Sequence, residues 1–437
     1  ALCDTYDSGT KIMSVIKEST GAAGWDHFVP GTPIISPNSS STYQIEPTIS
    51  FTAPATSSAT GAITSNQYND LVYAETSQQF TAVTGTASGD GVGASFDINR
   101  IGSKYYVAIN AAGSGYVRLE TITILGTSLG GATPANDLVI TLTTVTSGAV
   151  VDFDFDGIGS KGKFVAVPNN TAGRYSADGI TWAATTFPSS GSGVWTAMAS
   201  GLQNDGSSLY KQSAMIAVCA GSSNTATSAD GVTWSAGTAL PVAINTASGM
   251  DIAYGYTGVG INTFVVVSES DTDVAYTLDA GATWTTASSA LPGTGFTAVT
   301  YGKGKFVAVQ GGASTVAATS TDGISWTTVT LPASANWIDV VWGNGRFVAI
   351  ASTGVAAYSL DGTTWVQNNL PDQGVATFRN ITYGQGVFLV TRSAGYVPIY
   401  SEYGINWTTV AVTGFAGTGT GPVAFGNPDR IGKFVAL

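Results

Sequence analysis

A phrase of seven or eight residues occurs six times between Ser176 and Trp407 of this 437-residue chain. Five copies place Asp two residues after Ser or Thr, follow it with Gly and end on Trp, while the sixth has Tyr403 in place of Asp. The copies are Ser176–Trp182, Ser228–Trp234, Thr277–Trp284, Ser320–Trp326, Ser359–Trp365 and Ser401–Trp407. Successive tryptophans lie 52, 50, 42, 39 and 42 residues apart. Such a period predicts an array of similar units that bury their apolar faces against one another.

Two apolar strands are expected ahead of each phrase. The nearer one is clearest at Phe164–Val167, Phe306–Val309, Phe347–Ile350 and Phe434–Leu437. The farther one ends in an aromatic residue and a glycine, as in Tyr301-Gly302. With the strands on either side of the Asp-Gly turn, each unit has four strands, which is typical of a β-propeller blade. We predict an all-β propeller of seven blades, because the buried strand occurs seven times, with six blades as the alternative.

The last predicted blade is incomplete. Its two inner strands are expected at Pro422–Phe425 and Gly432–Leu437, and a seventh phrase would fall beyond Leu437. Three explanations stay open: a longer chain, strands donated by another chain, or closure by an upstream segment, for which Leu138–Val145 is the candidate. The sequence begins at Ala1 without Met, so we expect either that its N-terminus is processed or that it is part of a longer protein.

Composition excludes several classes of protein. Only 10% of residues are charged and 55 are Gly, which does not fit coiled coils, while 43% hydrophobic content does not fit a disordered chain. The net charge of −12 argues against a nucleic-acid partner, and no apolar run reaches the roughly 18 residues of a membrane span, so we expect neither. The two cysteines, Cys3 and Cys219, define no disulfide framework, and Cys219 is expected in a buried strand.

The repeated phrase resembles the Asp box of sialidase-type (BNR) propellers. Its physical role is local: the carboxylate accepts backbone N–H bonds in the turn between the two outer strands, Gly supplies a positive φ, and Trp packs beneath. We therefore assign structural roles to the phrase residues, which are Asp178, Trp182, Asp230, Trp234, Asp279, Trp284, Asp322, Trp326, Asp361, Trp365 and Trp407.

The first 150 residues contain no copy of the phrase. We predict a β-rich segment and linker at 1–77, a small Gly-rich β domain at 78–149 and the propeller at 150–437. The only helical candidates are Lys11–Glu18 and Asn66–Glu75. The small domain contains Gly113-Ser114-Gly115-Tyr116, Leu129-Gly130-Gly131 and Asn136-Asp137-Leu138, a pattern that resembles a module of tailed-phage virion proteins, especially of phages infecting cyanobacteria.

The predicted propeller offers few residues for glycosidase chemistry. A sialidase site needs an arginine cluster, a Tyr–Glu pair and an acidic acid/base residue. The predicted propeller has five arginines in unrelated positions of the repeat, and its only glutamates are Glu269 and Glu402; the arginines are Arg174, Arg346, Arg379, Arg392 and Arg430. We predict no catalytic, cofactor-binding or metal-binding residue.

An acidic triplet and the histidine of the chain are further candidates for chemistry. Asp152, Asp154 and Asp156 resemble half of a calcium loop, but Lys163 stands where the loop needs Glu, so we predict a half-buried strand aligned with the first strand of the first blade. His27 is the only histidine and is expected to be structural.

These observations favour display over catalysis. The resemblance to phage proteins implies a virion structural protein of the tail, baseplate or fibre, with the virion as its location. Its expected partners are other virion proteins, with a homo-oligomer such as a trimer and a host-surface glycan also considered. The alternative is a bacterial secreted or surface carbohydrate-binding propeller, and a sialidase-like glycosidase is the third hypothesis.

Overall fold

The structure is a computed structural model of the 437-residue chain. It describes residues 2–7, 12–16, 34–35, 42–43, 51–52 and 68–436, the last range with gaps at 75–76, 102–103, 158–161, 203–212, 243, 245, 248, 258–260, 375, 393–397, 410–420 and 427–432. Contacts divide the chain into a unit at Ala1–Glu46 and a unit at Pro47–Leu437.

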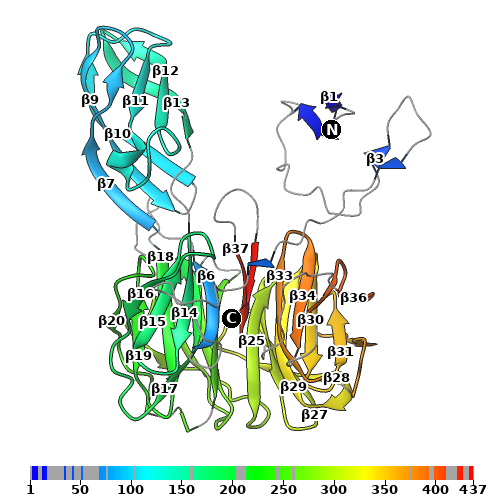
Figure 1. Cartoon of the computed structure of the whole chain (residues 1–437). Coiled ribbons are helices and arrows are strands. Elements are labelled where there is room, and N and C mark those ends of the chain that lie inside the picture. The colour runs from blue at the N-terminus through cyan, green and yellow to red at the C-terminus, as the bar shows by residue number, and fades with distance from the viewer. Residues whose placement is uncertain are drawn as a thin grey trace. The chain divides into compact units, whose positions relative to one another are not determined.

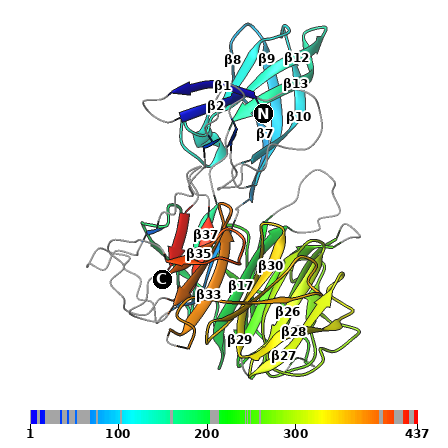
Figure 2. The same cartoon turned by 90° about the vertical axis from the view of Figure 1, so that its right-hand side faces the viewer.

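Seven sheets of the second unit form a β-propeller among the described residues, six of them antiparallel throughout (Figure 1, Figure 2). We number these blades in chain order by their first strands, which lie on the inner side. Blades 1 to 3 are β6 (Tyr68–Ala74), β14 (Lys163–Pro168), β15 (Ala172–Ser176) and β16 (Ala183–Thr186); β17 (Val194–Leu202), β18 (Ser213–Ala220), β19 (Thr225–Ser228) and β20 (Ser235–Ala236); and β21 (Met250–Tyr256), β22 (Asn262–Ser268), β23 (Ala275–Thr277) and β24 (Thr285–Thr286).

The remaining blades follow the same plan. Blades 4 to 6 are β25 (Phe296–Gly302), β26 (Lys305–Gln310), β27 (Ser314–Ser320) and β28 (Thr327–Ala335); β29 (Trp337–Gly343), β30 (Arg346–Ala351), β31 (Val355–Ser359) and β32 (Val366–Asn369); and β33 (Phe378–Gly384), β34 (Val387–Arg392), β35 (Ile399–Ser401) and β36 (Thr408–Thr409). Blade 7 contains β37 (Val423–Gly426), β38 (Lys433–Ala436) and β5 (Phe51–Thr52). The predicted all-β propeller fold is confirmed.

The first strands of the blades form a closed inner ring. They contact one another in the order β6, β17, β21, β25, β29, β33, β37 and back to β6. The second strand of each blade is a continuous apolar run, because neighbouring blades cover both of its faces. In blade 3, every residue of β22 is buried.

A glycine at the end of an inner strand lets the next blade approach closely. A Cβ added to Gly302 would lie 2.1 Å from Cγ of Trp342 in the next blade, and one added to Gly426 would lie 2.3 Å from Cδ2 of Tyr73. Side chains cannot come this close, so these positions require glycine. The same approach to an aromatic ring occurs at Gly201, Gly255, Gly343 and Gly384. The contact of Gly426 with Tyr73 joins blade 7 to blade 1.

The junction between blades 1 and 2 departs from this pairing on both sides. The inner strand of blade 1 ends at Ala74 instead of Gly, and blade 2 has Ser200 where the other inner strands have an aromatic residue. Both residues lie on neighbouring inner strands that contact each other. The small Ser200 leaves the space that the Cβ of Ala74 requires.

Blade 1 is interrupted by the small β domain. β6 pairs antiparallel with β14, with Leu71 opposite Ala166, although residues 77–157 between them belong to the inserted domain. The propeller therefore begins before residue 150, and the small domain predicted at 78–149 continues through Gly157. The helix predicted at Asn66–Glu75 is wrong.

The wrong prediction of a helix at Asn66–Glu75 has a physical origin. Tyr68, Leu71 and Ala74 are buried, so burial in β6 recurs every three residues, which resembles a helical period. The same pattern occurs in β29, where Trp337 and Val340 are buried. An inner strand is covered by its own blade and by both neighbouring inner strands, and this burial on several sides hides the two-residue period of an ordinary strand.

Blade 7 receives its third strand from far upstream in the chain. β37 and β38 are antiparallel, while β5 pairs parallel with β38 and places Phe51 opposite Phe434. Closure by an upstream segment is thus observed, but the segment is not Leu138–Val145. Those residues lie in β12 of the small domain, where β11 and β13 occupy both edges.

The small domain consists of two sheets with one shared core. One sheet has the order β10 (Lys104–Ser114), β9 (Val92–Ile101) and β7 (Ser77–Val83). The other has the order β13 (Ala149–Gly157), β12 (Leu138–Thr146), β11 (Thr121–Ile124) and β8 (Thr86–Ala87), and a short 3-10 turn, η2, spans Gly126–Leu129. Asp152, Asp154 and Asp156 lie on β13 and pair with β12, so the predicted strand is confirmed and its alignment with the first blade is wrong.

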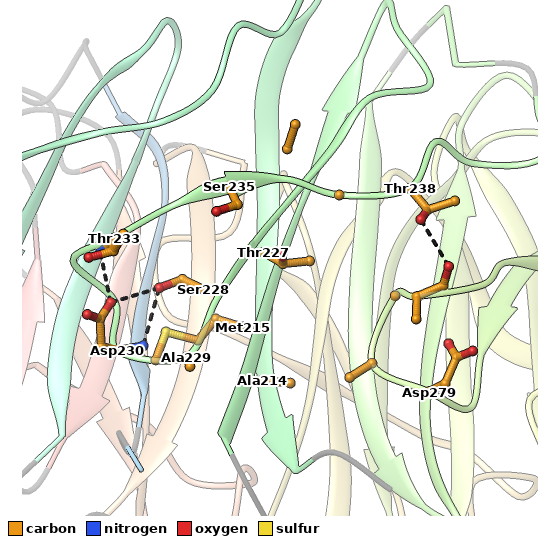
Figure 3. A pocket seen from close by; sticks show the side chains of 15 residues that line it. Ala214, Met215, Thr227, Ser228, Ala229, Asp230, Thr233, Ser235, Thr238 and Asp279 are labelled. Atoms are coloured by element: carbon orange, nitrogen blue, oxygen red, sulfur yellow. Dashed lines mark hydrogen bonds between the residues drawn. The ribbon is translucent and has the colours of Figure 1, made fainter. Parts of the chain in front are cut away.

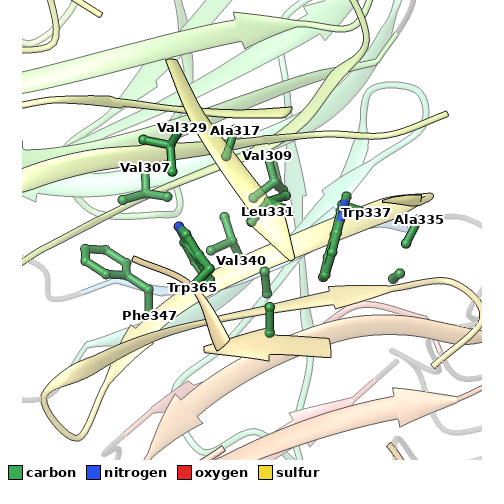
Figure 4. Packing of buried hydrophobic residues seen from close by; sticks show 14 residues of the cluster. Val307, Val309, Ala317, Val329, Leu331, Ala335, Trp337, Val340, Phe347 and Trp365 are labelled. Carbon is green, nitrogen blue, oxygen red and sulfur yellow. The ribbon is translucent and has the colours of Figure 1, made fainter. Parts of the chain in front are cut away.

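Apolar side chains fill the space between successive blades. Between blades 4 and 5, Val307 and Val309 of β26 and Leu331 of β28 pack against Trp337 and Phe347, as Figure 4 shows. Burial of side chains of this size contributes about 1.5–3 kcal/mol each. The blades are therefore held to one another by a core that repeats around the ring.

The first unit is described only through its strands. β1 (Leu2–Asp7) pairs with β2 (Ile12–Ile16), and β3 (Ile34–Ile35) pairs with β4 (Thr42–Tyr43). The helix predicted at Lys11–Glu18 is wrong, since β2 lies within it. Within the described ranges, no helix is long and apolar enough to span a bilayer.

Candidate functional site

Each repeated phrase forms the turn between the third and fourth strands of a blade. In blade 1, Oδ1 of Asp178 accepts N–H bonds from Ile180 and Thr181, both at 2.7 Å. The hydroxyl of Ser176 donates to the same carboxylate at 2.9 Å and accepts the N–H of Gly179 at 2.8 Å. Gly179 has a φ of 75°, which favours glycine. Equivalent bonds surround Asp230, Asp279, Asp322 and Asp361.

The hydrogen bonds set the charge state of these turns. Desolvation raises the pKa of Asp178, but the N–H bonds from Thr181 and Ile180 outweigh it, and the net pKa lies below the usual range. The carboxylate is therefore ionised at neutral pH and is already bound by donors of its own turn. The same direction holds for Asp230, Asp279, Asp322 and Asp361.

The turns also fasten each blade to the preceding one. A Cβ added to Gly323 in blade 4 would lie 2.6 Å from Cγ2 of Val265 in blade 3. Nζ of Lys163 in blade 1 donates to the backbone oxygen of Asp230 in blade 2 at 3.1 Å. The phrase therefore joins neighbouring blades as well as neighbouring strands.

The tryptophans lie against the base of the turns. Trp182, Trp234, Trp326 and Trp365 are buried, and Trp284 and Trp407 are partly buried. Nε1 of Trp326 donates to the oxygen of Gly323, and Nε1 of Trp365 to that of Gly362, both at 3.3 Å. The indole thus packs beneath the turn.

The sixth turn replaces the carboxylate with an aromatic contact. The N–H of Ile405 is accepted by the hydroxyl of Ser401 at 3.2 Å, and Tyr403 is exposed. The guanidinium of Arg346 in blade 5 lies 5.4 Å from the ring centre of Tyr403 and 5.6 Å from that of Tyr358. A cation–π contact therefore joins blades 5 and 6 at this turn.

Sequence reasoning missed three aspartates on the inner ring. Oδ1 of Asp70 accepts the N–H of Leu71 at 2.7 Å, and its Oδ2 accepts the N–H of Met198 in the next blade at 2.8 Å. Asp251 and Asp339 make the same pair of bonds in blades 3 and 5. When the repeats are aligned on the aromatic residue near the end of each inner strand, all three aspartates stand three positions before that residue. This alignment was the signal that could have found them.

A groove of about 570 Å³ lies between the turns of blades 2 and 3. Figure 3 shows Asp230 with its turn bonds on one side and Asp279 with Thr238 on the other. Thr227 and Ser235 add hydroxyls to the wall, and the remaining lining residues are small, apart from Met215. The two carboxylates of the groove already accept N–H bonds from their own turns, so the hydroxyl groups are the polar groups left to its wall.

The arginines considered for a sialidase site lie in different structural settings. Arg174 is on β15 of blade 1, and Arg346 on β30 makes the cation–π contacts described above. Arg379 is exposed on β33, and buried Arg392 at the end of β34 forms an ion pair with Asp372 at 2.5 Å. Arg430 lies outside the described residues.

The other candidate residues add no reactive cluster. Cys219 is a buried free thiol on β18, as predicted, and desolvation raises its pKa to about 11. His27 lies outside the described residues. Within the described part of the chain, no group of three or more His, Cys, Asp or Glu side chains could hold a metal ion.

No known protein family matches the chain, and no curated protein sequence does. Among solved structures, the chain is similar to YCF48 bound to D1 peptide, at 16% identity over 61% of this chain and 83% of that chain, with a TM-score of 0.46. It is also similar to virginiamycin B lyase from Staphylococcus aureus, at 12% identity over 60% of this chain and 84% of the lyase, with a TM-score of 0.47.

A third similar structure is the GH74 enzyme of Niastella koreensis. The identity is 15%, over 76% of this chain and 61% of the enzyme, and the TM-score is 0.36. These solved structures include enzymes and a peptide-bound protein, and none of their activities or ligands is carried over to this chain.

Proposed function

We propose that this chain is a non-enzymatic structural protein of a tailed-phage particle, with its propeller and inserted β domain used for contacts with neighbouring proteins of the particle or with a host surface. The resemblance of the small domain to phage virion modules supports the origin. The observation that carries the non-enzymatic part is the use of the carboxylates. In the five phrase turns and on the inner ring, they accept backbone N–H bonds and thereby stabilise the scaffold.

The tip of the small domain supports a role in protein contact. Val92, Val117 and Leu119 have exposed fractions of 63%, 64% and 64%. They lie close together because Val92 pairs with Ser114, and because buried Glu120 accepts N–H bonds from both Gly91 and Val117. Exposed apolar side chains on a rigid support are suited to burial against a protein partner.

The structure places this tip at the free end of the domain. The strands that connect to the propeller are β7, which begins at Ser77, and β13, which ends at Gly157. Ser77 pairs with Ile101 and Gly157 pairs with Leu138, both at the end of their sheet away from Val92. The insertion therefore presents the apolar tip away from its own connections.

Particle composition tests the proposal directly. Mass spectrometry and cryo-electron microscopy of purified particles are expected to find this chain at a fixed copy number. The variant Val117→Asp/Leu119→Asp should fold but lose incorporation into particles, since it places charge where apolar contact is expected. Val366→Asp is the matched control, because Val366 is also exposed, on the outer strand β32 of the propeller.

Two outcomes would contradict the proposal. The first outcome is that purified particles lack the chain while the chain binds glycans. If Ala236→Trp, which fills the groove of blades 2 and 3, abolishes that binding, a carbohydrate-binding propeller of the cell would be favoured. Hydrolysis of a fluorogenic glycoside by the purified chain would overturn the non-enzymatic part.

A further inference from the structure

The inner-ring aspartates occupy alternate blades. Each lies three positions before the residue at the aromatic position of its strand, in blades 1, 3 and 5. The equivalent residues in blades 2, 4, 6 and 7 are Ala197, Ala298, Asn380 and Pro422. Three is the largest number of positions in a ring of seven of which no two are neighbours. The sequence thus places one carboxylate at every second junction and an uncharged residue after each one.

Each aspartate joins its own blade to the next. Asp251 accepts the N–H of Ile252 at 2.9 Å and that of Val299 in blade 4 at 2.8 Å. Asp339 accepts the N–H of Val340 at 2.8 Å and that of Ile381 in blade 6 at 2.9 Å. Together with Asp70, these residues make three inter-blade links.

The surroundings of the three carboxyl groups contain little positive charge. Among the described side chains, none of the three forms an ion pair. Arg379 is the one cation on the inner strands and is exposed. The described second strands packed against the inner ring contribute five cations. Lys163, Lys305, Arg346 and Lys433 pair with residues at the opposite end of the inner strands. Arg392 pairs with Phe378 at the near end of β33, where it forms an ion pair with Asp372.

Desolvation and mutual repulsion both oppose ionisation of the ring. The pKa of Asp251 is raised to about 8. Desolvation is the main cause, and the charges of Asp339 and Asp70 also contribute. Desolvation likewise raises the pKa of Asp339 to about 7 and that of Asp70 to about 6, although their N–H bonds act in the opposite direction. The three groups therefore bind protons at pH values where ordinary carboxyl groups are ionised.

We propose that Asp70, Asp251 and Asp339 form a proton-dependent clasp, which holds neighbouring blades most firmly when its carboxyl groups are protonated and loosens as they ionise. A protonated carboxyl group still accepts N–H bonds through its oxygens. Protonation weakens these bonds, because N–H donors favour the ionised form, but it removes the desolvation penalty and the repulsion across the ring. The raised pKa values mean that the second effect is the larger one. This inference is independent of the proposed function.

The direction of the pH effect follows from linkage. The pKa values of the folded ring lie above the ordinary Asp value of 3.8, so the contribution of the clasp is full below about pH 4. It is lost as the pH rises through about 6, 7 and 8. Near pH 6 the folded ring holds about two protons that the unfolded chain does not, so the folding constant is expected to fall about a hundredfold per pH unit there.

The test is urea unfolding of the full chain at pH values between 5 and 9, with tryptophan fluorescence as the signal that monitors unfolding. Asp251→Asn places at this position the residue type that blade 6 carries as Asn380. Between pH 6 and 7.5, the folding constant of this variant should fall about tenfold less per pH unit than that of the unmodified chain. The matched control is Asp322→Asn in an outer turn, where the carboxyl pKa is lowered. It should lower stability by the same amount at every pH in this range.

Infrared spectroscopy gives a readout that does not depend on stability. The unmodified folded chain is expected to show protonated-carboxyl absorption at pH 6 that disappears by pH 9. Equal pH dependence of the unmodified chain and Asp251→Asn would overturn the clasp. If the variant does not fold, absence of the protonated-carboxyl band at pH 6 in the unmodified chain would overturn it instead.

Discussion

Substitution of Gly302 by Ala tests how the blades approach one another. The backbone φ of Gly302 is not in the left-handed region, so the cost arises from the new methyl group alone. The added Cβ would lie 2.1 Å from Cγ and 2.3 Å from Cδ2 of Trp342 in the next blade. Relief requires displacement of the indole, which packs on Phe347 with ring centres 4.6 Å apart. Overpacking of this kind costs about 1–3 kcal/mol of unfolding free energy.

A double-mutant cycle isolates that contact. Trp342→Ser removes a large, partly buried side chain and is expected to cost about 3 kcal/mol. The pair Gly302→Ala/Trp342→Ser reproduces the Ala74 and Ser200 combination of blades 1 and 2, so the clash should vanish. The double variant should be more stable than the sum of the single effects by about 1–3 kcal/mol.

Guanidinium chloride unfolding of the four chains supplies the values, and equal slopes confirm that the unfolded state is unchanged. Ala74→Gly is the control, expected to change stability by less than about 1 kcal/mol. Additivity within about 0.5 kcal/mol would refute the reasoning.

Three further experiments test other parts of the structure. Asp322→Ala removes the acceptor of the N–H groups of Ile324 and Ser325, so the free energy of unfolding measured in urea should fall by about 1–2 kcal/mol, whereas an unchanged value would mean that water replaces the carboxylate fully. Burial and a pKa of about 11 should leave the Cys219 thiol unreactive toward a thiol reagent at pH 8 until urea unfolds the chain, measured in a Cys3→Ser background; fast labelling of the folded chain would contradict this. Glu120→Gln leaves too few acceptors for three backbone N–H groups, so hydrogen exchange at Gly89, Gly91 and Val117 should accelerate, and unaltered exchange would show that the carboxylate does not hold the tip.

The propeller was predictable from sequence because its signals are local. A turn phrase and the apolar strand before it lie within about 20 residues, and the bonds of Asp178 or Asp322 involve only the next few residues. The partner of β6 lies beyond an inserted domain, and the partner of β38 lies at Phe51, so neither pairing leaves a local trace. The residues of the outer turns were therefore identified, while the first inner strand and the closing strand were not.

The outer turns and the inner ring show that hydrogen bonds alone do not decide the charge of an aspartate. Asp178 and Asp251 each accept two backbone N–H bonds, yet the pKa of Asp178 is lowered and that of Asp251 is raised to about 8. Around Asp251, desolvation and the charges of Asp339 and Asp70 outweigh the two bonds. The formal charge of −12 counts all acidic residues as ionised, so at pH 7 the folded chain should be less negative by about one to two charges. Unfolding at pH 7 should then release those protons. In the folded ring, the placement of the aspartates on alternate blades limits the negative charge that the ring holds when the carboxyl groups ionise.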